Sequence, residues 1–177
     1  MGSAYEKYRF RAMRPAAIIR WNLSTAFLRR RGAFVPKDYP DHHDAELVLR
    51  FYELRREEVL RAARSTINAW FPKTFDDLLA IAKPDHPSNA AFRQVIGYWE
   101  MVYGMARHGV IHPEFLMENS SEGIFMYARI EPFLAEWRAQ HSPRGFLNCE
   151  WVTTNTDLGR ELLKVCRDRF DKMLSAK

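Results

Sequence analysis

Apolar residues in this chain recur at intervals of three and four positions, and this spacing constrains the fold more than any other feature of the sequence. An α-helix brings such residues onto one face, whereas a half-buried strand would alternate with a period of two. Because the spacing continues through most of the chain, the sequence predicts an all-α fold, with a single compact helical bundle and a basic helical N-terminal arm. The clearest helix is expected over residues 88–108, ended by Gly109, with an apolar face made of Phe92, Val95, Ile96, Trp99, Val102, Tyr103 and Ala106.

Prolines and capping residues divide the rest of the helical pattern. Asp41 or Asp44 is expected to cap a long helix that runs to about residue 70, shortly before Pro72. The expected core face of this helix is Leu47, Val48, Phe51, Leu54, Val59, Ala62, Ala63 and Ile67. The other expected elements are a short helix capped by Thr74, helical segments at 113–117, 121–129 and 132–140, and a last helix capped by Asn155 or Thr156. Residues 146–154 are expected to be irregular, with an extended segment at 150–153 as the alternative.

Length and composition favour one folded domain. The chain has 177 residues, of which 47% are hydrophobic and 14% aromatic, too apolar for a disordered protein. Cys149 and Cys166 lie seventeen positions apart without a CxxC motif, so neither a disulfide framework nor a zinc site is predicted. No stretch approaches the ~18 apolar residues of a membrane span, and no secretory signal is recognisable. We therefore expect a cytoplasmic protein with reduced thiols and no cofactor.

The positive charge of the chain is concentrated at one end. Residues 1–36 contain eight basic residues and one acid, a net charge of +7, whereas the whole chain carries +5 and residues 37–177 therefore −2. Pro36 and Pro40 interrupt the helical pattern after this segment. We therefore predict a basic arm at 1–36, a linker at 37–43 and a helical domain at 44–177.

The arm admits three interpretations. Arginine beside aromatic residues is typical of protein interfaces, which favours docking on a partner protein or a second copy. A solvated extension packed on the body ranks second, and phosphate contact with nucleic acid ranks third because no nucleic-acid-binding motif is recognised. Membrane contact is disfavoured. The residues predicted to bind the partner are Arg9, Arg11, Arg14, Arg20, Trp21, Phe27, Arg29, Arg30 and Arg31.

Several short motifs follow one another in the middle of the chain: Ile96-Gly97-Tyr98-Trp99-Glu100, His108-Gly109-Val110-Ile111-His112-Pro113-Glu114, Met126-Tyr127, Ile130-Glu131-Pro132 and Trp137-Arg138. In this order they resemble a family of short bacterial all-helical proteins classed as a domain of unknown function. The resemblance covers about residues 44–155. It implies a compact bacterial helical domain and no particular activity, and the arm lies outside it.

Catalytic and metal-binding motifs are not recognisable. His42 and His43 are adjacent and do not share a helix face, and Gly109 and Pro113 interrupt the helix that would bring His108 and His112 together. Cys149 has no nucleophile signature around it, and the scattered glycines form no phosphate-binding loop. No metal site and no catalytic residue are predicted.

One carboxylate remains a candidate. Glu100 lies at the edge of the apolar face that contains Trp99, so it is expected to be partly buried. A structural ion pair with Arg138 or Arg129 is the favoured interpretation, and a pocket for a ligand or substrate is the alternative.

These observations together predict a non-catalytic, protein-binding helical module, an accessory or regulatory subunit of a larger bacterial assembly that docks through its arm. The alternatives are a nucleic-acid-binding protein that uses the arm, and a small enzyme or ligand-binding protein with a pocket near Glu100.

Overall fold

The computed structural model describes residues 37–175. The chain separates into two units between residues 33 and 34, and the described residues all belong to the second unit. The predicted helices of the arm, and all nine residues predicted to bind a partner there, lie outside the described part of the chain.

All regular secondary structure between residues 37 and 175 is helical, which confirms the predicted all-α class. In this part of the chain each helix is too short or too polar to cross a lipid bilayer. The elements are α1 (His42–Arg56), α2 (Glu58–Asn68), α3 (Phe75–Ala82), α4 (Asn89–Arg107), α5 (Pro113–Asn119), α6 (Glu122–Ile130), the 3₁₀ turn η1 (Glu131–Phe133), α7 (Leu134–Gln140), α8 (Leu147–Asn155) and α9 (Asp157–Ser175).

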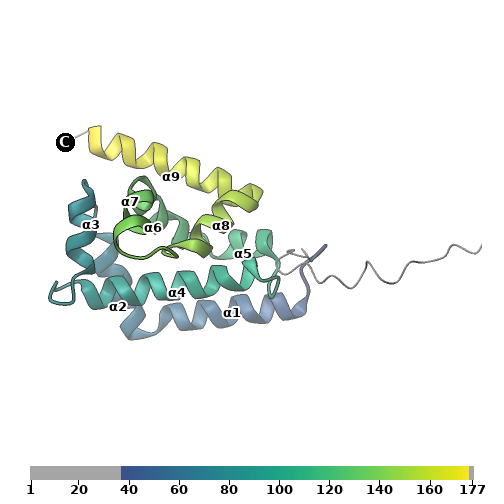
Figure 1. Ribbon diagram of the computed structural model, residues 1–177. Helices are drawn as coiled ribbons and strands as arrows, with labels where there is room; N and C mark the ends of the chain where they lie inside the picture. Colours follow the sequence, from purple (N-terminus) through teal and green to yellow (C-terminus); the bar gives the residue numbers. More distant parts are fainter. Residues whose placement is uncertain (1–36, 176–177) are drawn as a thin grey trace, which may run out of the picture. The chain divides into compact units, whose positions relative to one another are not determined.

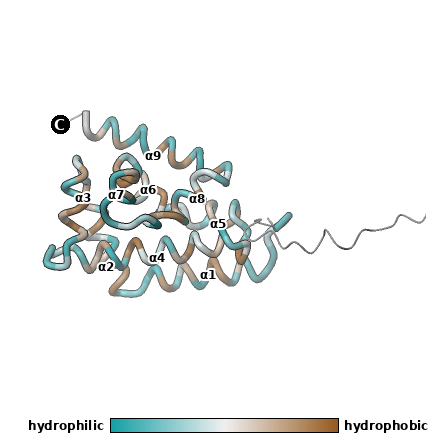
Figure 2. Tube along the Cα trace, viewed as in Figure 1, coloured by the Kyte–Doolittle hydropathy of each residue, from teal (hydrophilic) through white to brown (hydrophobic). Residues whose placement is uncertain are grey.

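Helix α4 lies in the middle of this unit. It packs against α2 on one side and α8 on the other, and α9 in turn covers α8, α6 and α5 (Figure 1). Hydrophilic and hydrophobic residues alternate along α4 and α9, as expected for helices with one buried face (Figure 2). The core is rich in aromatic side chains: Trp99 is only 1% exposed and packs on Tyr98 and Tyr103.

The predicted long helix is two helices. Residue Glu57, with ψ of 144°, leaves the helical conformation between α1 and α2. This break changes which residues of α2 face the core, because one non-helical residue rotates the following helix about its axis. The predicted core residue Val59 is 70% exposed and Ala62 is also exposed, whereas Leu60 is 3% exposed and shares the buried face with Ala63 and Ile67.

The stretch predicted to be irregular or extended is a helix, α8. Phe146, which precedes it, adopts the left-handed conformation with φ of 57°, and the first backbone N–H groups of α8 are capped by a side chain from α4. A local pattern cannot reveal a cap that lies nearly fifty positions away, and this explains the error.

The starts of α1, α3 and α9 agree with the predicted capping residues. The Asp41 carboxylate accepts a hydrogen bond from the Asp44 backbone N–H, and the Asp41 backbone N–H donates to the Asp44 carboxylate in return, which forms a capping box at α1. Thr74 and Asp77 form the same arrangement at α3, and the Thr156 hydroxyl accepts from the Gly159 N–H at the start of α9. Gly109, with φ of 70°, follows α4 as expected of a residue that ends a helix.

Candidate functional site

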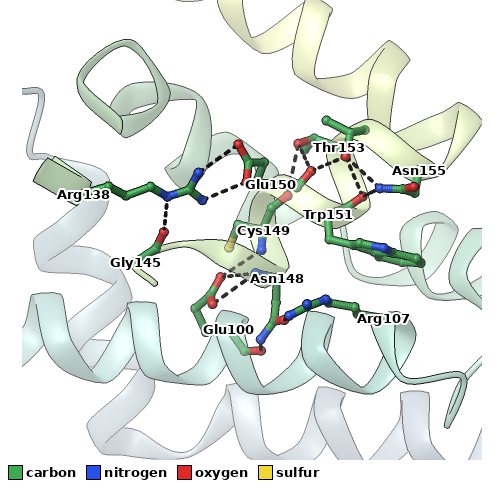
Figure 3. A network of polar contacts seen from close by, with 11 residues as sticks. Glu100, Arg107, Arg138, Gly145, Asn148, Cys149, Glu150, Trp151, Thr153 and Asn155 are labelled. Atoms are coloured by element: carbon green, nitrogen blue, oxygen red, sulfur yellow. Dashed lines mark hydrogen bonds and ion pairs between the residues drawn. The ribbon is translucent and has the colours of Figure 1, made fainter. Parts of the chain in front are cut away.

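Glu100 projects from α4 toward the start of α8 (Figure 3). Its carboxylate accepts hydrogen bonds from the backbone N–H of Cys149 at 2.8 Å and of Asn148 at 3.2 Å. The Asn148 side chain donates back to the Glu100 carbonyl oxygen at 2.9 Å, and Arg107 donates to the Asn148 side-chain oxygen at 3.2 Å. Because helix N-termini carry unpaired N–H groups and a partial positive charge, Glu100 acts as an N-terminal cap for a helix distant in sequence.

Neither arginine predicted to pair with Glu100 forms that ion pair. Arg138 instead makes a two-pronged contact with the Glu150 carboxylate, at 3.1 and 2.8 Å, and donates through Nε to the Gly145 carbonyl at 3.1 Å (Figure 3). The hydrogen bond to Glu150 raises the pKa of Arg138 above its ordinary value. Glu100 already has backbone donors from α8, and Glu150 presents both carboxylate oxygens to the flat guanidinium, a geometry that favours this pair.

Arg129 is 5% exposed and binds backbone oxygens rather than a carboxylate. Its guanidinium donates to the carbonyls of Ile67 at 2.8 Å and Trp70 at 2.6 Å, just where α2 ends. The rings of Phe71 and Phe125 lie 4.0 and 4.5 Å from the guanidinium carbon. Burial lowers the pKa of Arg129 to about 10, so the side chain stays protonated at neutral pH and caps the C-terminal end of α2.

Cys149 is fully buried beside Glu100. Burial, together with the neighbouring carboxylate, raises the pKa of its thiol well above the ordinary value. The thiolate is the reactive form of cysteine, so this environment opposes nucleophilic chemistry at Cys149. Trp99, the other residue singled out beside Glu100, belongs to the aromatic core.

A cavity of about 490 Å³ opens beside Glu100, between α4 and the segment from the end of α7 to the start of α8; we call it the Glu100 cavity. A volume of this size suits a small organic ligand. Its charged and titratable lining residues are Arg93, Glu100, His141 and Arg144, and its main apolar lining residues are Ala82, Pro84, Phe92, Ile96, Trp137 and Phe146.

Sequence reasoning singled out Glu100 but missed the residues that surround the cavity with it. Trp137, His141, Arg144 and Phe146 come from α7 and from the loop after it, which the sequence places far from Glu100. The run Ser142-Pro143-Arg144-Gly145 indicates a loop, but nothing in it indicates that this loop lies over α4.

The histidines do not form a metal centre. Within residues 37–175, no group of three or more His, Cys, Asp or Glu side chains is close enough to hold a metal ion. The His112 side chain accepts a hydrogen bond through Nδ1 from the Phe115 N–H at 3.2 Å and thereby caps α5.

Fold and site together define a helical domain whose candidate site is an apolar cavity with charged groups beside an interhelical carboxylate cap. Comparison with family models gives a more specific assignment. The chain belongs to the family described as Domain of unknown function (DUF4760), whose model matches residues 40–156, about two thirds of the chain. This match shows the resemblance to an uncharacterised family. No curated protein and no solved structure matches the chain.

Proposed function

We propose that this protein is a non-catalytic binding module that docks on a partner protein through residues 1–36. The observation that carries the proposal is the charge distribution, +7 on the arm against −2 on residues 37–177. Trp21 and Phe27 stand among the arginines of the arm, and arginine with aromatic residues supplies both the charge and the apolar area of interface hot spots.

The described part of the chain supports a binding role. Three side chains of reactive types near the cavity have structural roles: Glu100 caps α8, Arg138 pairs with Glu150, and the Cys149 thiol is buried with a raised pKa. Such groups stabilise an arrangement of helices rather than stand ready to react.

We further propose that the module is an accessory or regulatory subunit of a larger assembly in the bacterial cytoplasm. Cys149 and Cys166 are both free thiols, as expected in a reducing compartment.

The proposal can be tested with affinity-tagged full-length protein in native lysate of its host. The comparison proteins are residues 37–177, the triple variant Arg29→Gln, Arg30→Gln, Arg31→Gln, and the double variant Trp21→Ala, Phe27→Ala. All samples are treated with nuclease before elution. We expect one protein to be retained in stoichiometric amount by the full chain, and to be lost from the other three.

Two results would contradict docking on a protein. If capture disappears with nuclease, and binding to purified nucleic acid weakens steeply with salt, the arm contacts phosphates instead. If the full chain and residues 37–177 retain the same proteins, the arm has no docking role.

A second candidate function is binding of a small ligand in the Glu100 cavity. It is favoured by the volume of about 490 Å³ and by a lining that combines aromatic side chains with charged groups. It is tested by screening small aromatic molecules against the ¹⁵N-labelled full-length protein. We expect binding to shift the Trp137 indole N–H and the Gly97 and Gly145 amide signals together; shifts confined to other regions would refute this site.

A further inference from the structure

We propose that the Glu100 cavity selects small aromatic molecules that carry a negatively charged group such as a carboxylate. The inference rests on the second function proposed above and names the class of ligand. It is carried by three features of the cavity: its aromatic walls, an indole N–H without a partner, and an excess of cationic groups.

Phe92, Trp137 and Phe146 are among the residues that line the cavity. Trp137 lies between Phe92 and Phe146, with ring centroids 6.3 and 5.7 Å away and edge-on geometry. The His141 ring stacks on Trp137 at 4.0 Å. A flat apolar molecule gains favourable ring contacts with such a wall in addition to the area it buries.

The indole N–H of Trp137 has no acceptor. The residue is 5% exposed, lines the cavity, and its Nε1 atom is buried without a hydrogen-bond partner among the described residues. A Cβ placed on Gly145, another lining residue, would lie 2.4 Å from Nε1, so this glycine is needed for the indole to sit where it does. Buried indole N–H groups ordinarily have acceptors, and an oxygen atom of a ligand would supply one once the Gly145 backbone that packs against Nε1 moves aside.

The charged groups of the cavity favour an anion. Arg93 and Arg144 line it and are exposed, and neither side chain makes a hydrogen bond or ion pair with another described residue. The one carboxylate in the lining, Glu100, is already engaged by the backbone N–H groups of α8. An anionic ligand can therefore pair with either arginine without displacing an existing contact.

Gly97 offers a way to fill the cavity without disturbing the fold. It lines the cavity from α4, and a Cβ added there would meet nothing within 4 Å. Replacing a helical glycine with leucine also favours the helix. Gly97→Leu should therefore occlude the cavity in a folded protein, and Gly97→Ala serves as the smaller matched change.

The experiment titrates full-length protein with 2-naphthoate, its neutral analogue 2-naphthamide and the cation 2-naphthylmethylammonium, by calorimetry and by ¹⁵N NMR. We expect the anion to bind about tenfold more tightly than the amide, as one charge-assisted hydrogen bond would give. We expect the cation to bind most weakly.

The double variant Arg93→Gln, Arg144→Gln should lose the preference for the anion but still bind the amide. Gly97→Leu should abolish binding of both, and Trp137→Phe identifies the indole signal that shifts.

The possible results distinguish selection of anions from ligand binding in the cavity in general. If naphthoate and naphthamide bind equally well and Gly97→Leu abolishes both, the cavity binds ligands but does not select anions, and this inference is wrong. If none of the three compounds binds, or if Gly97→Leu leaves binding unchanged, ligand binding in the cavity is itself refuted.

Discussion

At the scale of single residues, three carboxylates join helices that are distant in sequence. The Glu100 carboxylate accepts hydrogen bonds from backbone N–H groups in the first turn of α8. Glu114 accepts hydrogen bonds from the N–H groups of Asp157 and Leu158 at the start of α9. Asp44 accepts a hydrogen bond from the N–H of His112, just before α5. Each carboxylate meets the positive end of a helix dipole and satisfies donors that would otherwise lack partners. These contacts fix the positions of helices relative to one another as well as stabilise individual helices.

Substitutions at Glu100 should separate the contribution of its charge from that of its hydrogen bonds. Glu100→Gln keeps an acceptor but loses the charge, so we expect it to lower the free energy of unfolding by about 1 kcal/mol. Glu100→Ala leaves the N–H groups of Asn148 and Cys149 unpaired and should cost about 2 kcal/mol. Urea denaturation measures both, with exposed Glu136→Gln as the control. Equal stability of the Glu100→Ala variant and the unmodified protein would refute the capping role.

Asp44 should make stability sensitive to acid. Burial opposes its ionisation, but Lys37 at 2.8 Å and the N–H groups of Asp41 and His112 together hold the pKa of Asp44 below its usual 3.8. The ionised form is thus favoured by folding, and its contribution is complete above the unfolded pKa and lost as the pH falls through the lower folded pKa. The difference in unfolding free energy between the unmodified protein and Asp44→Asn should be largest above about pH 5 and shrink toward pH 2. A difference that stays constant over this range would contradict the assignment.

Arg129 should contribute more to stability than any exposed arginine. Arg129→Met removes the donors that the Ile67 and Trp70 carbonyls use, and we expect it to lower the free energy of unfolding by about 3 kcal/mol. Arg129→Lys keeps the charge but loses the planar group held between Phe71 and Phe125, so it should rescue only part of the loss. Arg167 pairs with Glu131 at the surface and provides the matched control. Arg167→Gln should lower the free energy of unfolding by less than about 1 kcal/mol. Similar losses for Arg129→Met and Arg167→Gln would show that the buried arginine has no special role.

At the scale of elements, the break at Glu57 decides which side of α2 is buried. Leu60→Ala should cost about 2–5 kcal/mol because it leaves a space in the core. Val59→Ala, one position earlier, should change stability by less than about 0.5 kcal/mol because Val59 is exposed. Thermal or urea unfolding of the two variants provides the test. The reverse order of effects would mean that the helix continues through Glu57 as the sequence pattern predicted.

The helices that the sequence predicted correctly are those whose signals are local. The apolar face of α4, the helix starts capped by Asp41 and Thr74, and the end of α4 before Gly109 each depend on residues within a turn or two of one another. The errors arise where tertiary contacts decide, as at α8, which Glu100 caps from α4. The candidate site shows the same limit: the sequence indicated Glu100, but the cavity beside it depends on a loop packed over α4, which no spacing rule reveals.

At the scale of the whole molecule, the buried core identified in the described part of the chain lies between Phe51 and Phe170, entirely within the second unit. A unit with its own hydrophobic core is expected to fold independently. The arm, residues 1–36, instead carries a net charge of +7, whereas residues 37–177 carry −2. Folding and docking should therefore be separable by removing residues 1–36.

We expect a protein of residues 37–177 to give a helical circular dichroism spectrum and to unfold in a single cooperative transition. Their free energy of unfolding should lie within about 1 kcal/mol of that of the full chain, because the core and the caps at α1, α8 and α9 are all retained. Urea denaturation followed by tryptophan fluorescence and by circular dichroism provides the measurement, since coincident curves indicate two-state unfolding. A loss of cooperativity on truncation would mean that the arm completes the fold, and the loss of a captured partner from residues 37–177 would then report unfolding rather than docking.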